Sequence, residues 1–170
     1  MTVTVREATE EDADIISNIH QLAFGRIEEA NLVENIRRSK AYLKALSLVA
    51  EVENQVCGHI LFSRVEIEGL PENDLLALAP VAVLPERQNQ GVGSSLIKAG
   101  IEIAEKNQFK LITVLGEPSY YSRFGFKTAI DFQVESPFPV ESKYYMVLPL
   151  GSYNSSIKGK IIYPQAFQDC

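Results

Sequence analysis

A strand, a glycine turn and a helix follow one another between residues 75 and 107, and this stretch constrains the fold more than any other. Residues 75–84 form an apolar run short enough for one buried strand. The turn at 85–94 holds Gly91 and Gly93, and apolar residues then recur at helical spacing. Glycines let the main chain approach an anion, and a helix start directs N–H groups and a positive dipole end at it. The stretch therefore predicts a phosphate-binding turn.

The spacing within the turn limits which phosphate ligand it fits. It reads Gln88-x-x-Gly91-x-Gly93, without the Gly-Lys-Ser/Thr of a nucleoside-triphosphate loop and without the three spaced glycines of a dinucleotide fingerprint. Together with the Ala-Val-Leu-Pro run at 82–85, the turn resembles the pyrophosphate loop of the GNAT acetyltransferases.

A second motif, at residues 114–126, also resembles this family. It matches the segment in which these enzymes leave a strand and present a tyrosine to the cofactor sulfur. That tyrosine stands four residues before a Gly-Phe pair, which selects Tyr121 ahead of Gly125 and Phe126. With residues 59–63, the match is nearest to the YhbS-like subgroup and covers roughly residues 3–150.

The resemblance implies an α/β (α+β) domain of GNAT fold at residues 1–150. Its sheet would be mixed and mostly antiparallel, with about six or seven strands flanked by helices and a splay between the fourth and fifth strands. Pro80 supports a break in strand pairing there, because proline donates no ladder hydrogen bond. Residues 151–170 would be an extension packed on the domain, since their end is too apolar for a disordered tail.

The resemblance also implies acetyl-CoA as cosubstrate and assigns residues to it. The main chain of the splayed strand would hold the pantetheine arm, and the turn would hold the pyrophosphate. The cofactor-binding residues would be Val81, Ala82, Val83, Gln88, Asn89, Gln90, Gly91, Val92, Gly93, Ser94 and Tyr121.

The implied reaction is direct acetyl transfer to a primary amine in a ternary complex. The Val83 N–H would polarise the thioester carbonyl as an oxyanion donor. Tyr121 would protonate the leaving thiolate, because a phenol with a pKa of ~10 stays protonated above the ~8.5 of a thiol. Two other readings stay open: Tyr121 packs while Tyr120 faces the cofactor, or both rings pack.

The group that deprotonates the amine is not evident from the sequence. Many relatives use a glutamate on the central strand, but residues 77–81 here hold no carboxylate. Glu29, Glu117 and His59 are the substitutes, although a histidine in an apolar strand is more often structural. A pair of Cys57 and His59 would allow an acyl-enzyme, but neither lies in the cofactor segments, so direct transfer is preferred.

The acceptor is predicted to be an amine of a small molecule or a peptide. Its candidate contacts are Phe24, Glu29 and Ser63, from the first two helices and the hairpin strand; the alternative is that such polar groups merely face solvent. Two rival functions stay open. The chain could be a non-catalytic acyl-CoA-binding or regulatory module, or a transferase that uses a different acyl-CoA.

Composition sets further limits on partners and location. With 170 residues the chain suits one domain, and its net charge of −6 argues against nucleic-acid binding. No apolar run is long enough for a membrane span, and we expect no membrane partner. Two cysteines favour a cytoplasmic protein, and the two histidines and two cysteines lack metal-ligand spacing, so no metal is expected. A homodimer is an expectation taken from the family alone.

Periodicity places the remaining elements. We predict strands at residues 3–6, 46–52, 56–67, 110–115, 127–134 and 142–150, and a loop at 69–74. Helices are predicted after an N-cap at Thr9, at 27–38 and at 91–107, with a short helix or turn at 118–124. Gly25 separates the first two helices, and Gly58 suggests a bulge or a close approach of another segment.

Overall fold

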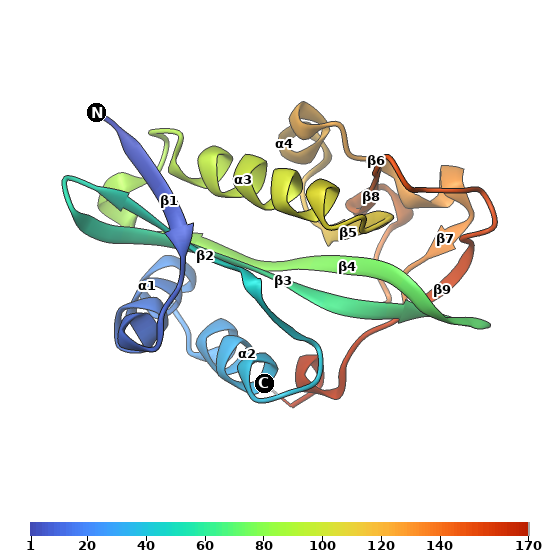
Figure 1. Ribbon diagram of the computed structural model, residues 1–170, viewed down its shortest axis with the longest axis horizontal. Helices are drawn as coiled ribbons and strands as arrows, with labels where there is room; N and C mark the ends of the chain where they lie inside the picture. Colours follow the sequence, from blue (N-terminus) through green and yellow to red (C-terminus); the bar gives the residue numbers. More distant parts are fainter. Residues whose placement is uncertain (170) are drawn as a thin grey trace. The chain divides into compact units, whose positions relative to one another are not determined.

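The computed structural model describes residues 1–169, with side chains for 1–70 and 74–169. The strands are β1 (Val3–Glu7), β2 (Tyr42–Val52), β3 (Gln55–Ile67), β4 (Leu70–Val83), β5 (Leu111–Leu115), β6 (Lys127–Thr128), β7 (Val134–Glu135), β8 (Tyr145–Pro149) and β9 (Gly159–Ile162) (Figure 1). The helices are α1 (Ala13–Phe24), α2 (Glu28–Arg37), α3 (Val92–Lys106) and α4 (Pro118–Tyr121). No helix among the described residues is long and apolar enough to cross a membrane.

The strands form one mixed sheet in the order β1-β2-β3-β4-β5-β8-β6, and β9 pairs with β3 and β7. The pairs β4–β5 and β7–β9 are parallel, while β1–β2, β2–β3, β5–β8, β6–β8 and β3–β9 are antiparallel. The predicted fold class is confirmed. The nine strands among residues 1–169 exceed the expected six or seven because the two-residue strands β6 and β7 and the tail strand β9 also pair.

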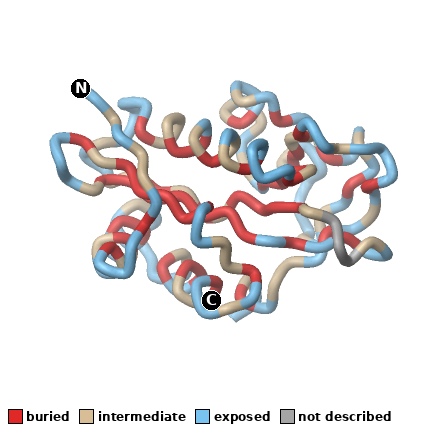
Figure 2. The backbone as a smooth tube through the Cα atoms, in the orientation of Figure 1, coloured by how far each residue is buried: buried red, intermediate tan, exposed pale blue. Residues whose placement is uncertain are grey.

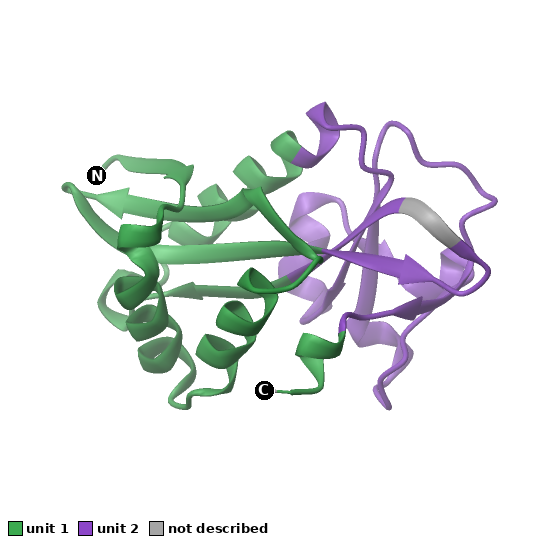
Figure 3. Ribbon diagram, turned by 60° about the horizontal axis from the view of Figure 1, so that its bottom comes forward, with its two compact units in different colours: residues 1–63, 79–103, 165–170 green, residues 64–78, 104–164 purple. Residues whose placement is uncertain are grey.

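The chain divides into two compact units (Figure 3). Unit 1 holds residues 1–63, 79–103 and 165–170, and unit 2 holds residues 64–78 and 104–164. The long strands β3 and β4 each contribute residues to both units. Buried residues run along the strands of the sheet (Figure 2).

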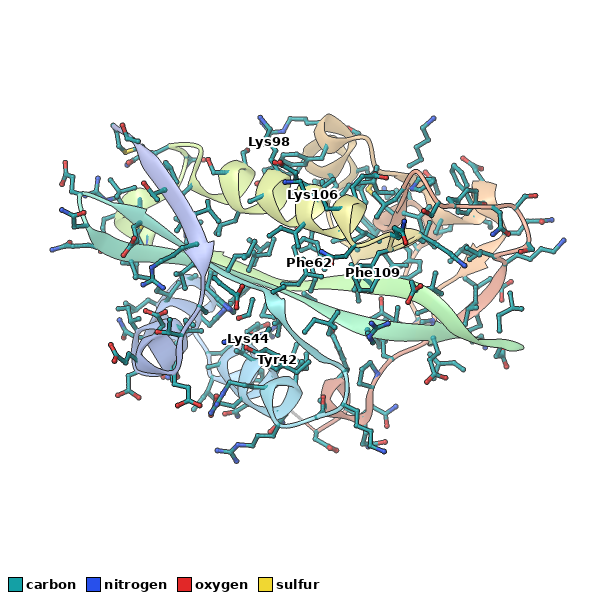
Figure 4. The ribbon with its side chains drawn as sticks, viewed as in Figure 1. Tyr42, Lys44, Phe62, Lys98, Lys106 and Phe109 are labelled. Atoms are coloured by element: carbon teal, nitrogen blue, oxygen red, sulfur yellow. The ribbon has the colours of Figure 1, made fainter. Side chains whose placement is uncertain are left out.

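In unit 1, helices cover both faces of β2 and β3. Helices α1 and α2 lie on one side and α3 on the other (Figure 1). The first face buries a cluster made of Ala8, Ile16, Leu32, Val33, Ile36, Val49, Leu61 and Ala166. On the opposite face the Phe62 ring lies under α3, where any Cβ at Gly100 would collide with it (Figure 4). The glycine is therefore required for this close approach.

The predicted bulge in β3 is confirmed. Ala50 pairs with Gly58 and Glu51 pairs with Val56, so β3 has one extra residue, Cys57, in this register. A Cβ at Gly58 would lie 3.0 Å from Val92 and 3.1 Å from Leu96 of α3. The bulge and the missing side chain together let α3 approach the strand.

Unit 2 has its own core. Buried apolar residues of β4, β5 and β8 meet those of the tail, including Leu75, Leu111, Val147, Ile157 and Ile161. The Tyr163 hydroxyl is 2.9 Å from the Tyr145 hydroxyl and 3.4 Å from Thr113 Oγ1. Burial raises the pKa of both tyrosines, so these phenols stay neutral hydrogen-bonding groups.

Four predicted segments differ from the structure. The predicted strand at 142–150 is shorter, because Ser142–Tyr144 form a 3-10 turn and β8 begins at Tyr145. Residues 69–74 are not a loop: β4 begins at Leu70, because Gly69 with a φ of 80° completes a tight turn and lets the strand continue. Residues 127–134 are not one strand, since a 3-10 turn at Ala129–Phe132 separates β6 from β7 and Gln133 is left-handed at 58°. Finally, β2 starts at Tyr42, four residues earlier than predicted.

Candidate active site

The predicted phosphate-binding turn leads from the end of β4 into α3 within unit 1. The Gln88 side-chain amide donates to the Val83 carbonyl at 3.0 Å, and this bond ties the turn to the strand. Asn89 and Gly91 are left-handed, with φ of 61° and 84°. The Gly91 carbonyl accepts the Ser95 N–H at 3.0 Å and starts the helical hydrogen bonds of α3. The turn residues from Gln88 to Gly91 are exposed, so their main chain is open to a ligand.

Residues Gly93 and Ser94 belong to the first turn of α3, which begins at Val92. The first amides of an α-helix have no partner within the helix and carry its positive dipole end. A helix of 15 residues supplies this dipole in full. The predicted residues of the turn thus lie at a helix N-terminus suited to a pyrophosphate.

The end of β4 presents its main chain in two directions. The Leu84 N–H donates to the Cys57 carbonyl of β3 at 2.8 Å, and the Ala82 carbonyl faces Gly58. Because polar main-chain groups alternate along a strand, those of Val81 and Val83 face away from β3. The N–H groups of Val81 and Val83 are therefore directed to the side of β4 away from β3.

Strand β4 also contains the break that Pro80 suggested. The ladder between β4 and β5 covers Leu75–Ala77 and Leu111–Thr113 in unit 2. The Ala79-Pro80 peptide bond that follows is cis, and β4 continues from there to Val83.

Tyr121 lies at the end of α4 in unit 2 and is 9% exposed. Its ring packs edge-on against Tyr120 and Phe126, with centroid distances of 5.0 and 5.7 Å. Burial, with a smaller contribution from Tyr120, raises the pKa of Tyr121 to about 12. The phenol is therefore protonated at neutral pH and able to donate a proton or hydrogen bond.

Tyr120 sits in a different environment from Tyr121. The Arg123 guanidinium lies over the Tyr120 ring, 4.6 Å from its centroid, and its Nε donates to the Tyr120 carbonyl at 3.3 Å. Tyr120 is only partly buried. The Glu117 carbonyl accepts the N–H groups of both tyrosines and so fixes the start of α4.

The predicted acceptor contacts from the first two helices lie together in unit 1. Phe24, at the end of α1, stacks on His20 at a centroid distance of 6.1 Å. Glu29 accepts hydrogen bonds from Arg26, including Arg26 Nε to Oε1 at 2.9 Å. This hydrogen bond is the main reason that the pKa of Glu29 is lowered, with a smaller effect from His20. The carboxylate is therefore ionised close to the His20 ring.

Sequence reasoning missed His20 and Ser47, which hold His59 between them. His20 Nε2 is 2.8 Å from His59 Nδ1, and Ser47 Oγ is 2.9 Å from His59 Nε2. His20 and His59 are fully buried, and burial lowers the pKa of both, that of His20 to about 4. The only sequence signals for these contacts were a histidine on the apolar face of α1 and another in an apolar strand.

This arrangement bears on the two remaining candidates. Both ring nitrogens of His59 already have partners, and burial raises the pKa of the Cys57 thiol. A protonated thiol is a poor nucleophile, and an imidazole with both nitrogens bonded does not activate it, which disfavours an acyl-enzyme. Ser63 is fully buried, and its Oγ has no hydrogen-bond partner among the described residues.

Comparisons with known proteins agree with this geometry. Residues 44–128 match the family model described as acetyltransferase (GNAT) domain. The chain is 36% identical to the uncharacterized N-acetyltransferase YjhQ of Escherichia coli K12 over 155 residues, which cover 88% of this chain and 86% of YjhQ. It is 28% identical to the uncharacterized N-acetyltransferase YhbS of the same organism, with 80% of each chain covered.

Two solved structures share the fold along almost the whole chain. The Escherichia coli YhbS structure in complex with CoA has a TM-score of 0.89 at 27% identity and covers 98% of this chain and 92% of YhbS. A GNAT-family acetyltransferase from Brucella melitensis in complex with acetyl-CoA has a TM-score of 0.81 at 33% identity and covers 98% of both chains.

Proposed function

The chain belongs to the GNAT family of N-acetyltransferases, and we propose that it moves the acetyl group of acetyl-CoA to a primary amine of a small molecule or peptide. Transfer occurs directly, in a ternary complex. The observation that carries the proposal is the exposed turn Gln88–Gly91 at the start of α3, tied to the end of β4 through Gln88 and Val83. The CoA and acetyl-CoA complexes of the two similar structures support the same cosubstrate.

Two groups of this chain would serve the chemistry. The Val83 N–H, directed away from β3, would donate to the carbonyl oxygen as negative charge develops there. Tyr121, held protonated by burial, would give its proton to the departing thiolate. The two roles are separate, and each is open to its own test.

The acceptor would bind beside Phe24, Glu29 and Ser63. The Glu29 carboxylate favours a cationic acceptor, and the partly exposed Phe24 ring offers apolar contact to its carbon chain. The cytoplasm is the proposed location, supported by the low cysteine count. We retain a homodimer as a proposal from the family.

The test is release of CoA thiol from acetyl-CoA with spermidine, L-lysine, kanamycin and a tetrapeptide with a free N-terminus. Succinyl-CoA replaces acetyl-CoA in a parallel series, and calorimetry measures acetyl-CoA binding to the protein alone. Turnover with one amine class and acetyl-CoA supports the proposal. Faster turnover with succinyl-CoA would correct the acyl donor, and binding without turnover for any amine would favour a binding module. Absence of binding would refute the role of the turn.

A further inference from the structure

A continuous hydrogen-bonded chain of three side chains crosses one face of the sheet in unit 1. It links His20 on α1 to His59 on β3 and Ser47 on β2, with heteroatom distances of 2.8 and 2.9 Å. All three residues are buried, and His20 Nδ1 has no hydrogen-bond partner among the described residues. One end of this hydrogen-bonded chain is therefore a buried ring nitrogen without a hydrogen-bond partner. A buried polar atom without a partner requires an explanation.

The hydrogen-bonded chain of His20, His59 and Ser47 has two proton arrangements of equal charge. In one, His20 Nε2–H donates to His59 Nδ1 and His59 Nε2–H donates to Ser47 Oγ, which leaves a lone pair on His20 Nδ1. In the other, Ser47 O–H donates to His59 Nε2, His59 Nδ1–H donates to His20 Nε2, and His20 Nδ1 carries a proton. A shift of every proton along the chain converts the first arrangement into the second.

The His20 and His59 end lies at β3, the strand next to β4 in the sheet. The His59 ring is on the face of β3 covered by α1, opposite the face on which Gly58 meets α3. His20 stacks on Phe24 and lies close enough to Glu29 for their charges to interact. The open nitrogen is thus beside two of the residues proposed to receive the acceptor.

The Ser47 end lies on β2, on the side of β3 away from β4, and opens on a pocket of about 510 Å³. Thr9, Glu10, Glu34, Arg37, Tyr42 and Lys44 line this pocket together with residues of α1. Tyr42 and Lys44 belong to β2 and are labelled in Figure 4. Because Glu10 and Lys44 at this pocket are exposed to solvent, water enters it, and a proton that reaches Ser47 has an acceptor.

We propose that His20, His59 and Ser47 form a proton relay that removes the proton of the acceptor amine and delivers it to water in the pocket at Ser47. This inference rests on the proposed function and supplies the base that β4 lacks. His20 Nδ1 takes the proton from the ammonium group, directly or through one water, and leaves a neutral amine.

The proton count balances at every step. As His20 Nδ1 gains the amine proton, His20 Nε2–H passes to His59 Nδ1 and His59 Nε2–H passes to Ser47 Oγ. The original Ser47 hydroxyl proton leaves to water. After the products depart, the same steps in reverse return the tautomers and release the Nδ1 proton to solvent. No ring becomes an imidazolium, which burial would penalise.

Two carboxylates act on the histidines of the relay, and each is already paired with an arginine. Glu29 of α2 acts on His20, and it is paired with Arg26. Asp12, in the turn before α1, acts on His59 and is paired with Arg6 at 2.8 Å. Each carboxylate thus has a cationic partner of its own, and burial decides the state of the two rings.

The test compares Ser47→Ala, His59→Gln and His20→Asn with wild type, using the panel amine of highest turnover as acceptor. At pH about 7 each variant loses about 10²- to 10⁴-fold in kcat/KM, the usual contribution of a general base. The loss narrows toward pH about 10, where an alkylamine deprotonates by itself. Hydroxylamine, which is already neutral at pH 7, serves as the second acceptor. With it, the variants show no comparable loss of kcat/KM.

Two further variants separate the relay from packing. Ser47→Thr keeps the hydroxyl and retains most of the activity. Val49→Ala removes buried volume opposite His59 without touching a proton path, and its small loss is the same at every pH. An equal loss in Val49→Ala and Ser47→Ala, or a loss that is constant with pH, would overturn the relay.

A spectroscopic experiment tests the coupling of the two histidines without any acceptor. Ring ¹⁵N shifts should report both histidines as neutral at pH about 6, and Ser47→Ala should change the tautomer balance of His20 as well as His59. A change confined to His59 would show that the two rings are not coupled and would overturn the relay. If wild type turns over no amine although the rings are coupled, the proposed function fails and the catalytic role fails with it; turnover that Ser47→Ala leaves intact refutes the relay alone.

Discussion

Gly116 lies against the ring of Tyr121, and a Cβ at Gly116 would be 2.8 Å from Cδ2 of that ring and still nearer to Cε2. No real Cβ tolerates such an approach to a buried ring, so the glycine fixes where the phenol sits. The position of the proposed acid therefore depends on the missing side chain of Gly116, which directly follows the end of β5 at Leu115.

Gly116→Ala is expected to displace the Tyr121 ring. The overpacking costs about 1–3 kcal/mol of unfolding free energy and lowers kcat by more than stability explains. Urea unfolding and steady-state kinetics measure the two effects. Ser119→Ala, an exposed change in the same segment, is the control and should leave both values near wild type. An unchanged kcat in Gly116→Ala would mean that the ring position is irrelevant to turnover.

Tyr121→Phe keeps the packed ring and removes only the hydroxyl. We expect kcat to fall about 10²- to 10⁴-fold with little change in acetyl-CoA affinity. Because the pKa of Tyr121 is raised to about 12, this group stays protonated through neutral and mildly alkaline pH. Wild-type kcat should not decline between pH about 7 and 10 through loss of this proton.

The matched control is Tyr120→Phe, the neighbouring ring under Arg123. It should leave kcat near the wild-type value. If Tyr120→Phe shows the large loss and Tyr121→Phe does not, the acid is Tyr120 and Tyr121 has a packing role.

The local parts of the fold were accessible from the sequence because they depend on short-range patterns. The turn before α3 was predicted from the spacing of Gln88, Gly91 and Gly93, and its geometry follows from main-chain conformations that glycine permits. The helices α1 and α2 and their separation at Gly25 follow from periodicity and a left-handed cap at 69°.

The contacts between distant segments were not accessible. His20 and His59 are 39 residues apart, and His59 and Ser47 meet only through the register of β2 and β3, which contains a bulge. A one-residue change in register would turn His59 to the other face, so no pattern in a single strand predicts its partners. Sequence reasoning therefore identified His59 as a candidate base but missed the residues on either side of it.

The Asp12 carboxylate joins β1 to the start of α1 through Arg6 and the Thr9 N–H, at 2.8 and 2.7 Å. The hydrogen bond from Arg6 is the main reason that the pKa of Asp12 is lowered to about 2. Because the folded pKa lies below the unfolded value of ~3.9, this stabilisation is complete above that value and is lost as pH falls toward 2.

Asp12→Asn should therefore lower the unfolding free energy by about 1–2 kcal/mol at neutral pH, a range reduced for the partly exposed Arg6 partner. The difference from wild type should shrink as pH falls from about 4 to 2. Denaturant unfolding at several pH values measures it, and the exposed change Glu10→Gln is the control. A difference that is the same at low and neutral pH would show that lost packing, not charge, is responsible.

Gly91→Ala tests the cosubstrate turn through backbone strain alone. Gly91 has a φ of 84° with nothing within 4 Å of its Cβ position, so alanine meets no clash but favours a different conformation. The strain costs about 1–2 kcal/mol. If the mutant relieves this strain by shifting the turn, acetyl-CoA affinity falls about tenfold or more.

The control variant Gly69→Ala is matched in strain, with a φ of 80° and open space, but lies in the β3–β4 turn. It should lose similar stability while calorimetry shows unchanged acetyl-CoA affinity. If the two variants lost the same acetyl-CoA affinity, the turn at Gly91 would not be the acetyl-CoA-binding segment.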